Sequence, residues 1–125
     1  MTYWAMNNVN QGFISYVPSR DDTIEKFRIL NVVEGLPPKT VNFHYFPKKN
    51  FERARGLIQT GDLIFFVSTK RRLDVFHTGL LFIKGDDILM RHATRTAGKV
   101  IEQSLAEFLK SHRMSGFMLF RPLWQ

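Results

Sequence analysis

Two histidines, His77 and His92, are the residues of this chain best suited to chemistry. An imidazole can act as a base near neutral pH, and a second polar group beside it can fix its tautomer and orientation. The segment between them predicts a β-hairpin, because two apolar runs flank residues 84–87 (KGDD). Glycine and aspartate accept the unusual dihedral angles that such a turn requires.

The length of this turn decides whether the two imidazoles meet. If Lys84 pairs with Asp87 across a two-residue turn, His77 lies opposite Thr94 and His92 lies opposite Gly79. Side chains alternate between the faces of a strand, so His77 and His92 would then share a face as diagonal neighbours. A three- or five-residue loop would place them on opposite faces. From the spacing alone, two unrelated histidines at strand ends are the simpler interpretation.

The composition indicates a globular domain without cysteine chemistry. The 125 residues correspond to one domain or less, and 44% hydrophobic with 23% charged residues argues against disorder. The absence of cysteine excludes disulfides and cysteine-ligated metals. A net charge of +7 favours anionic partners in general, such as nucleic acid, acidic lipid or an anionic cell-wall polymer, without selecting among them. A solvated basic surface explains the charge equally well.

The order of the expected elements predicts an α+β fold, with an antiparallel sheet after a helical beginning. We expect a single partial domain, in which residues 1–60 form a helical or irregular lead-in and residues 61–125 form the sheet with one helix. No apolar run is long enough to span a membrane, and the N-terminus does not resemble a signal peptide. The expected helices are residues 2–12, a segment capped by Asp21 or Asp22 and ending at Leu30, a short helix capped by Asn50, and one that starts at Ser104 and ends before Gly116. The expected strands are residues 41–46, 63–67, 78–83, 88–92, 99–101 and 117–120, and residues 35–38 are expected to break the chain.

Three motifs carry a resemblance to a known family. Residues 61–66 (GDLIFF), 77–82 (HTGLLF) and 89–94 (LMRHAT) resemble the signature of NlpC-type papain-like cysteine peptidases. Residues 73–79 (LDVFHTG) are closer to one branch, the N-acetylmuramoyl-L-alanine amidase-like family. Residues 36–38 (LPP), 45–47 (YFP), 116–122 and, more weakly, 4–13 also resemble that family. The resemblance is specific over residues 61–94 and diffuse elsewhere.

The resemblance implies a papain-like fold and a hydrolase that cleaves peptidoglycan amides. It assigns His77 as the catalytic base and His92 as the orienting residue. The nucleophilic cysteine of such enzymes begins a helix before these strands, and no residue here matches it. We therefore expect the C-terminal portion of such a domain, incomplete without an N-terminal segment or a second copy. The resemblance also implies a periplasmic or secreted enzyme.

Other candidate residues have weaker support. Asp74 and Thr94 are candidate substrate-binding residues, although Asp74 is equally compatible with a structural role in a turn. A zinc site from His77, His92 and Asp74 lacks the HExxH spacing of zinc hydrolases, so we predict no metal and no cofactor. His44 and His112 lie outside the resemblance and are expected to be surface or half-buried residues.

The alternative function is a non-catalytic basic module that binds an anionic polymer, either cell-wall glycan or nucleic acid. Aromatic and basic residues interleave in residues 43–49 and 117–121, as they do in many nucleic-acid-binding surfaces. Both stretches also have the pattern of strands that feed a hydrophobic core, and we favour that interpretation. Nucleic acid is therefore the less expected partner.

Overall fold

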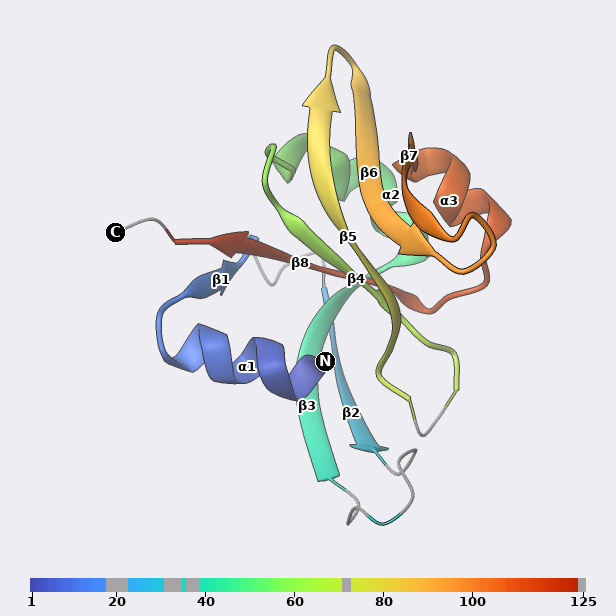
Figure 1. Cartoon of the computed structure of the whole chain (residues 1–125). Helices are drawn as coiled ribbons and strands as arrows, with labels where there is room; N and C mark the ends of the chain where they lie inside the picture. Colours follow the sequence, from blue (N-terminus) through green and yellow to red (C-terminus); the bar gives the residue numbers. More distant parts are fainter. Residues whose placement is uncertain (18–22, 31–34, 36–38, 71–72, 124–125) are drawn as a thin grey trace.

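The computed structural model describes residues 1–17, 23–30, 35, 39–70 and 73–123. Its elements combine short helices with an eight-stranded antiparallel sheet of order β2-β3-β8-β4-β5-β6-β7, and β1 pairs with β8 beside this path (Figure 1). The predicted α+β class is therefore confirmed. The elements are α1 (Thr2–Asn10), β1 (Ile14–Tyr16), β2 (Ile24–Leu30), β3 (Lys39–Pro47), η2 (Lys48–Asn50), α2 (Phe51–Ala54), η3 (Arg55–Leu57), β4 (Leu63–Val67), β5 (Val75–Lys84), β6 (Asp87–Thr94), β7 (Lys99–Ser104), α3 (Leu105–Ser111) and β8 (Gly116–Pro122).

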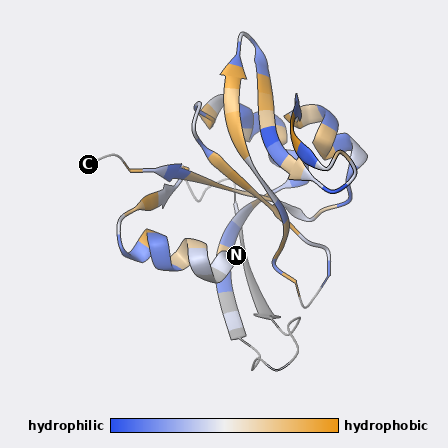
Figure 2. Cartoon of the chain, in the orientation of Figure 1, coloured by the Kyte–Doolittle hydropathy of each residue, from blue (hydrophilic) through white to orange (hydrophobic). Residues whose placement is uncertain are grey.

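The central strands β4 and β8 are buried on both faces. Ile64 and Phe66 of β4 belong to a core that α2 and α3 cover, whereas Phe65 and Val67 belong to a second core under α1. This alternation follows from the two-residue period of a strand. The apolar run predicted to be a strand buried on both faces is confirmed, and Figure 2 shows the hydrophobic character of these strands.

The hairpin between β5 and β6 has the predicted register. Lys84 pairs with Asp87, and the ladder continues to Leu80 opposite Arg91. Gly85 adopts a φ of 63°, a left-handed conformation that glycine accepts without a steric penalty. The two-residue turn therefore fixes which face each side chain of β5 and β6 occupies.

The start of α3 is also as predicted. The Ser104 side chain accepts a hydrogen bond from the backbone N–H of Glu107, which satisfies one of the free amides at the helix start. The preceding strand is longer than predicted, because β7 runs from Lys99 to Ser104 rather than ending at Ile101. Strand β7 therefore leads directly into α3.

A half-buried ion pair joins the start of β4 to the end of β8. Arg121 donates two hydrogen bonds to the carboxylate of Asp62, at 2.9 and 3.0 Å, and a third to the carbonyl of Leu57. Asp62 is 1% exposed and also accepts from the backbone of Gln59. The aspartate of the GDLIFF motif therefore has a structural role.

The prediction for the first half of the chain was partly wrong. The segment expected to be a helix ending at Leu30 is strand β2. It pairs with β3 along its whole length, with Ile24 opposite Tyr45 and Leu30 opposite Lys39. Residues 1–60 therefore contribute three strands to the sheet and are not a helical lead-in. Pairing with β3 gives the backbone of this segment its hydrogen-bond partners, and such tertiary pairing overrides a weak helical spacing. The proposed caps Asp21 and Asp22 lie outside the described residues, as do residues 36–38 of the break expected at residues 35–38.

Helix α1 is confirmed at Thr2–Asn10, and the short helix after Asn50 is confirmed as α2, although the Asn50 side chain makes no capping bond. None of the helices in the described ranges combines the length and apolar character needed to cross a membrane.

Candidate active site

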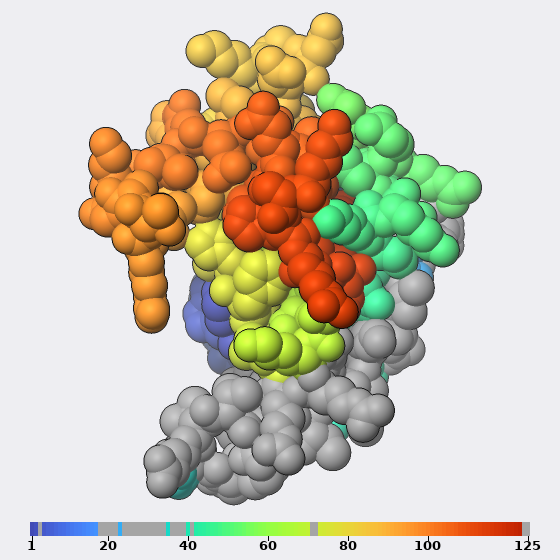
Figure 3. All heavy atoms as spheres, turned by 90° about the vertical axis from the view of Figure 1, so that its right-hand side faces the viewer, coloured from blue at the N-terminus to red at the C-terminus, as the bar shows by residue number. Residues whose placement is uncertain are grey.

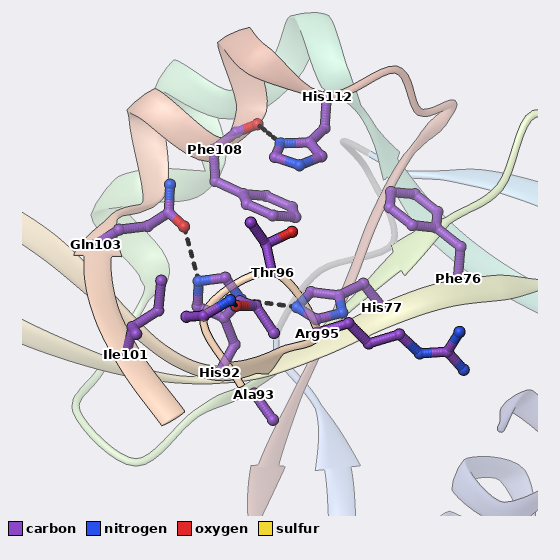
Figure 4. Close-up of a pocket in the computed structure, with 12 residues that line it drawn as sticks. Phe76, His77, His92, Ala93, Arg95, Thr96, Ile101, Gln103, Phe108 and His112 are labelled. Carbon is purple, nitrogen blue, oxygen red and sulfur yellow. Dashed lines mark hydrogen bonds between the residues drawn. The ribbon is translucent and has the colours of Figure 1, made fainter. Parts of the chain in front are cut away.

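His77 and His92 meet on one face of the sheet. The Nε2 atom of His77 lies 2.7 Å from Nδ1 of His92, and the two ring planes are inclined at 84° (Figure 4). Leu80 pairs with Arg91, and His77 and His92 each lie an odd number of residues from this pair, so their side chains share one face of the sheet. Both rings contact Phe108, so this is the face that α3 covers. The predicted diagonal contact between the two imidazoles is therefore present.

Gln103 extends this pair into a row of three polar side chains. Its Oε1 atom lies 2.7 Å from Nε2 of His92. In the β6–β7 register His92 is opposite Ile101, so Gln103 is the diagonal neighbour of His92 on the same face. The sequence interpretation missed Gln103 because the predicted strand ended at Ile101. A strand extended to the cap at Ser104 would have placed Gln103 on the histidine face.

Aromatic rings surround the histidines and hold them in place. His77 stacks on Phe108, with ring centroids 5.5 Å apart. It also stacks on the ring of Phe66, which lies on the neighbouring strand β4. Phe108 also meets the ring of His92 edge-on, with centroids 5.4 Å apart. Burial lowers the pKa of His77 below 6.5, and the nearby imidazoles of His92 and His112 lower it further. His77 is consequently neutral at neutral pH, the form that can accept a proton.

The two histidines open onto a cavity of about 680 Å³. Strands β5 to β7, the β6–β7 connection and α3 form its walls. Figure 3 shows this connection, in orange, projecting beside α3. Thr94 lines the cavity together with both histidines, and Arg95 contributes a positive charge. Neither aspartate nor glutamate is found among the described residues that line it. The cavity is therefore open to a ligand with a negative group.

His112 is exposed, as expected for a surface residue, and it also lines the cavity. Its ring stacks on Phe108 with centroids 3.9 Å apart, and its Nδ1 atom lies 3.1 Å from the carbonyl of Phe108. The stack of His112, Phe108 and His77 forms an aromatic wall that no short motif in the sequence indicated. His44 is elsewhere, beside Tyr16.

Asp74 lies apart from the histidines. The residue is 4% exposed, and its side chain accepts a hydrogen bond of 2.7 Å from the backbone N–H of Thr2, at the start of α1. Burial raises the pKa of Asp74, but hydrogen bonds from Thr2 and Val75 outweigh this effect and leave the pKa below its ordinary value. Within the described residues, no three histidine, aspartate or glutamate side chains are grouped closely enough to hold a metal ion.

The fold is similar to that of known amidase structures. The chain is similar to an N-acetylmuramoyl-L-alanine amidase from Bacteroides uniformis, with a TM-score of 0.77, 24% identity, and coverage of 97% of this chain and 62% of that one. Another crystal structure of an amidase from that organism gives a TM-score of 0.82 at 22% identity, covering 97% and 63%. A Legionella pneumophila protein gives 0.76 at 15% identity, covering 97% and 60%. The chain therefore spans less than two thirds of the length of these structures.

The family follows from the sequence itself. The model of the N-acetylmuramoyl-L-alanine amidase-like family, AmiA-like, matches residues 6–117. The chain belongs to this family, and the resemblance seen in the motifs is confirmed. Comparison with curated proteins gave no match.

Proposed function

We propose that this chain carries the base and substrate-binding part of a papain-like thiol hydrolase that cleaves peptidoglycan amides. The observation that carries the proposal is the contact of 2.7 Å between His77 and His92 at the wall of a cavity. Family membership supports the substrate class, because the family is named for an amidase of N-acetylmuramoyl-L-alanine, in which an amide joins the muramoyl group to alanine. The 125 residues contain no cysteine, so a thiol at this site has to come from outside this sequence.

His77 is the proposed general base. Its Nε2 atom is engaged with His92, whereas no described residue forms a hydrogen bond with its Nδ1 atom. A thiol beside Nδ1 would transfer its proton to this nitrogen, and the resulting thiolate would attack the amide carbonyl carbon. His77 would then give the proton to the leaving nitrogen as the C–N bond breaks. Water, deprotonated by His77, would hydrolyse the thioester and regenerate the thiol.

His92 is the proposed orienting residue. It is 5% exposed and is held between His77 and Gln103 by two contacts of 2.7 Å. A ring fixed at both nitrogens can neither rotate nor exchange its partners freely, so it holds the imidazole of His77 in one orientation. This role resembles that of the third residue in other hydrolytic triads.

Thr94 and Arg95 are the proposed substrate-binding residues. Both line the cavity beside the histidines, and Arg95 forms no ion pair with any residue that the structure describes. A guanidinium group binds a carboxylate through paired hydrogen bonds. Together with family membership, this charge supports a muramoyl peptide with a free carboxylate near the reacting amide as the proposed ligand of the cavity.

The test is hydrolysis of N-acetylmuramoyl-L-alanyl peptides by the complete gene product that contains these residues. His77→Ala is expected to lower kcat by about 100-fold or more, the usual contribution of a general base. His44→Ala is the matched control, because His44 lies beside Tyr16 and away from the cavity, and it should leave kcat unchanged. Absence of hydrolysis by the gene product, or equal activity of the His77→Ala variant, would refute the proposal.

A further inference from the structure

We infer that Gln103 is a positioning residue that sets the tautomers of His92 and His77. In these tautomers the ring nitrogen that remains free to accept a proton is Nδ1 of His77. The inference rests on the proposed function, because only a base at this atom gives the tautomer a purpose. By this inference Gln103, on β7 and two strands away from His77, determines which nitrogen of His77 can accept the proton of the thiol.

The chemistry of the three side chains fixes the positions of the protons. The Oε1 atom of Gln103 can only accept a hydrogen bond, so Nε2 of His92 must carry a proton at a separation of 2.7 Å. A neutral imidazole carries one proton, which leaves Nδ1 of His92 as an acceptor. The contact of 2.7 Å then requires Nε2 of His77 to donate. The remaining nitrogen of His77, Nδ1, is left unprotonated.

The opposite arrangement would remove the base. If a donor stood in place of the Gln103 oxygen, Nε2 of His92 would accept, and Nδ1 of His92 would donate to His77. The neutral ring of His77 would then carry its proton on Nδ1, and this nitrogen would have no lone pair with which to accept the proton of a thiol. One amide oxygen, in a residue remote from the reacting atoms, therefore decides whether His77 can act as a base.

The surroundings of Gln103 fix the backbone that carries its side chain. The residue pairs with Met90 in the β6–β7 ladder, and Ser104, which follows it, is the N-cap of α3. The backbone of Gln103 is thus fixed on both sides. Figure 4 shows its oxygen directed at the His92 ring and its nitrogen turned away.

Two substitutions separate the acceptor from the size of the side chain. Gln103→Glu keeps an acceptor at the same position, since a carboxylate at neutral pH has no proton to donate. Gln103→Met keeps a similar length and removes the acceptor. We expect Gln103→Glu to preserve both tautomers, whereas Gln103→Met should leave His92 as a mixture of tautomers and weaken its hydrogen bond with His77.

The experiment is nuclear magnetic resonance of the ¹⁵N-labelled histidine side chains in this chain, recorded above the pKa of His77. The wild-type protein should show protons on Nε2 of both rings and a scalar coupling between His77 Nε2 and His92 Nδ1. Gln103→Glu should retain this coupling and Gln103→Met should lose it. A wild-type proton on His77 Nδ1 would overturn the inference, as would a folded Gln103→Met variant with unchanged tautomers. If Gln103→Met fails to fold, the wild-type spectrum and Gln103→Glu still decide.

The measurement requires neither thiol nor substrate, so its outcome is independent of the proposed function. If the tautomers are as predicted but the gene product does not hydrolyse muramoyl peptides, the proposed function is refuted and the tautomer assignment remains intact. Hydrolysis that depends on His77, together with a proton on its Nδ1 atom, would refute the role of Gln103 alone.

Discussion

The ring of His77 stacks on that of Phe108, with centroids 5.5 Å apart and planes inclined by 25°. This stack removes water from one side of an imidazole that already contacts His92. An apolar ring stabilises the neutral form over the cation, because the cation loses hydration without gaining a counter-charge. The same contact therefore positions the proposed base and keeps it unprotonated.

The lowered pKa of His77 predicts a loss of stability on mild acidification. The unfolded chain takes up a proton on this residue as the pH falls below 6.5, whereas the folded chain does not until the pH reaches its lower pKa. The free energy of unfolding should therefore decrease over this interval. Denaturant titrations at several pH values should show the decrease, and it should be smaller in His77→Gln. An equal slope in the variant would contradict the lowered pKa.

Asp74→Ala is expected to lower the free energy of unfolding by about 1–3 kcal/mol, because the buried carboxylate accepts the backbone N–H of Thr2 at the start of α1. Since the pKa of Asp74 is lowered on folding, its contribution is complete above pH 3.8 and is lost as the pH falls through the folded pKa. Asp87→Ala, at an exposed position, is the control.

The same variant tests whether Asp74 binds substrate. The carboxylate lies outside the cavity, so Asp74→Ala should leave the Kd for N-acetylmuramoyl-L-alanine unchanged once the variant is folded. A weaker Kd in the folded variant would restore the role in substrate binding that the sequence suggested.

Gly116→Ala should destabilise the fold, because the added Cβ would overlap the carbonyl oxygen of Phe46 and lie 2.7 Å from Cδ2 of Tyr45. Overpacking of this kind costs about 1–3 kcal/mol. Gly56→Ala is the matched control, since a Cβ there meets nothing within 4 Å and the residue has no positive φ. Thermal unfolding of both variants checks the prediction, which fails if the two melting temperatures are the same.

Arg95→Ala should weaken the binding of a carboxylate-bearing muramoyl peptide and reduce the salt dependence of its Kd. Exposed charges are screened by salt, so the contribution of Arg95 should be largest at low ionic strength. Arg91→Ala is a matched control, because Arg91 is paired with Glu102 and is not among the residues that line the cavity. Equal losses of affinity in the two variants would indicate a general effect of net charge.

The sequence was most informative where local chemistry determines geometry. The turn at Gly85 and Asp86 fixed the hairpin register, and this register alone placed His77 and His92 on one face. Ser104 marked the start of α3 for a similar local reason, since its side chain satisfies a backbone amide three residues away. These features depend on contacts between residues close together in the chain.

The sequence-based predictions were wrong or incomplete where contacts between distant parts of the chain determine the structure. Ile24, Phe27 and Leu30 are spaced as on a helix, yet the segment pairs with β3 along its whole length. The wall formed by His112 and Phe108 depends on how α3 packs against the sheet, and Gln103 enters the site only through the pairing of β7 with β6. The spacing of His112 and Gln103 from the histidine motifs carries no signal of these contacts.

The most direct test of the account is a titration of the ¹⁵N-labelled chain with N-acetylmuramoyl-L-alanine, followed by nuclear magnetic resonance. We predict saturable shift changes concentrated at His77, His92, Thr94 and Arg95, with little change at His44. Single-stranded oligonucleotide, as a competing anionic ligand, should not produce the same changes. Shift changes elsewhere on the molecule, or none at ligand concentrations that approach its solubility, would contradict the claim that this cavity binds the cell-wall ligand.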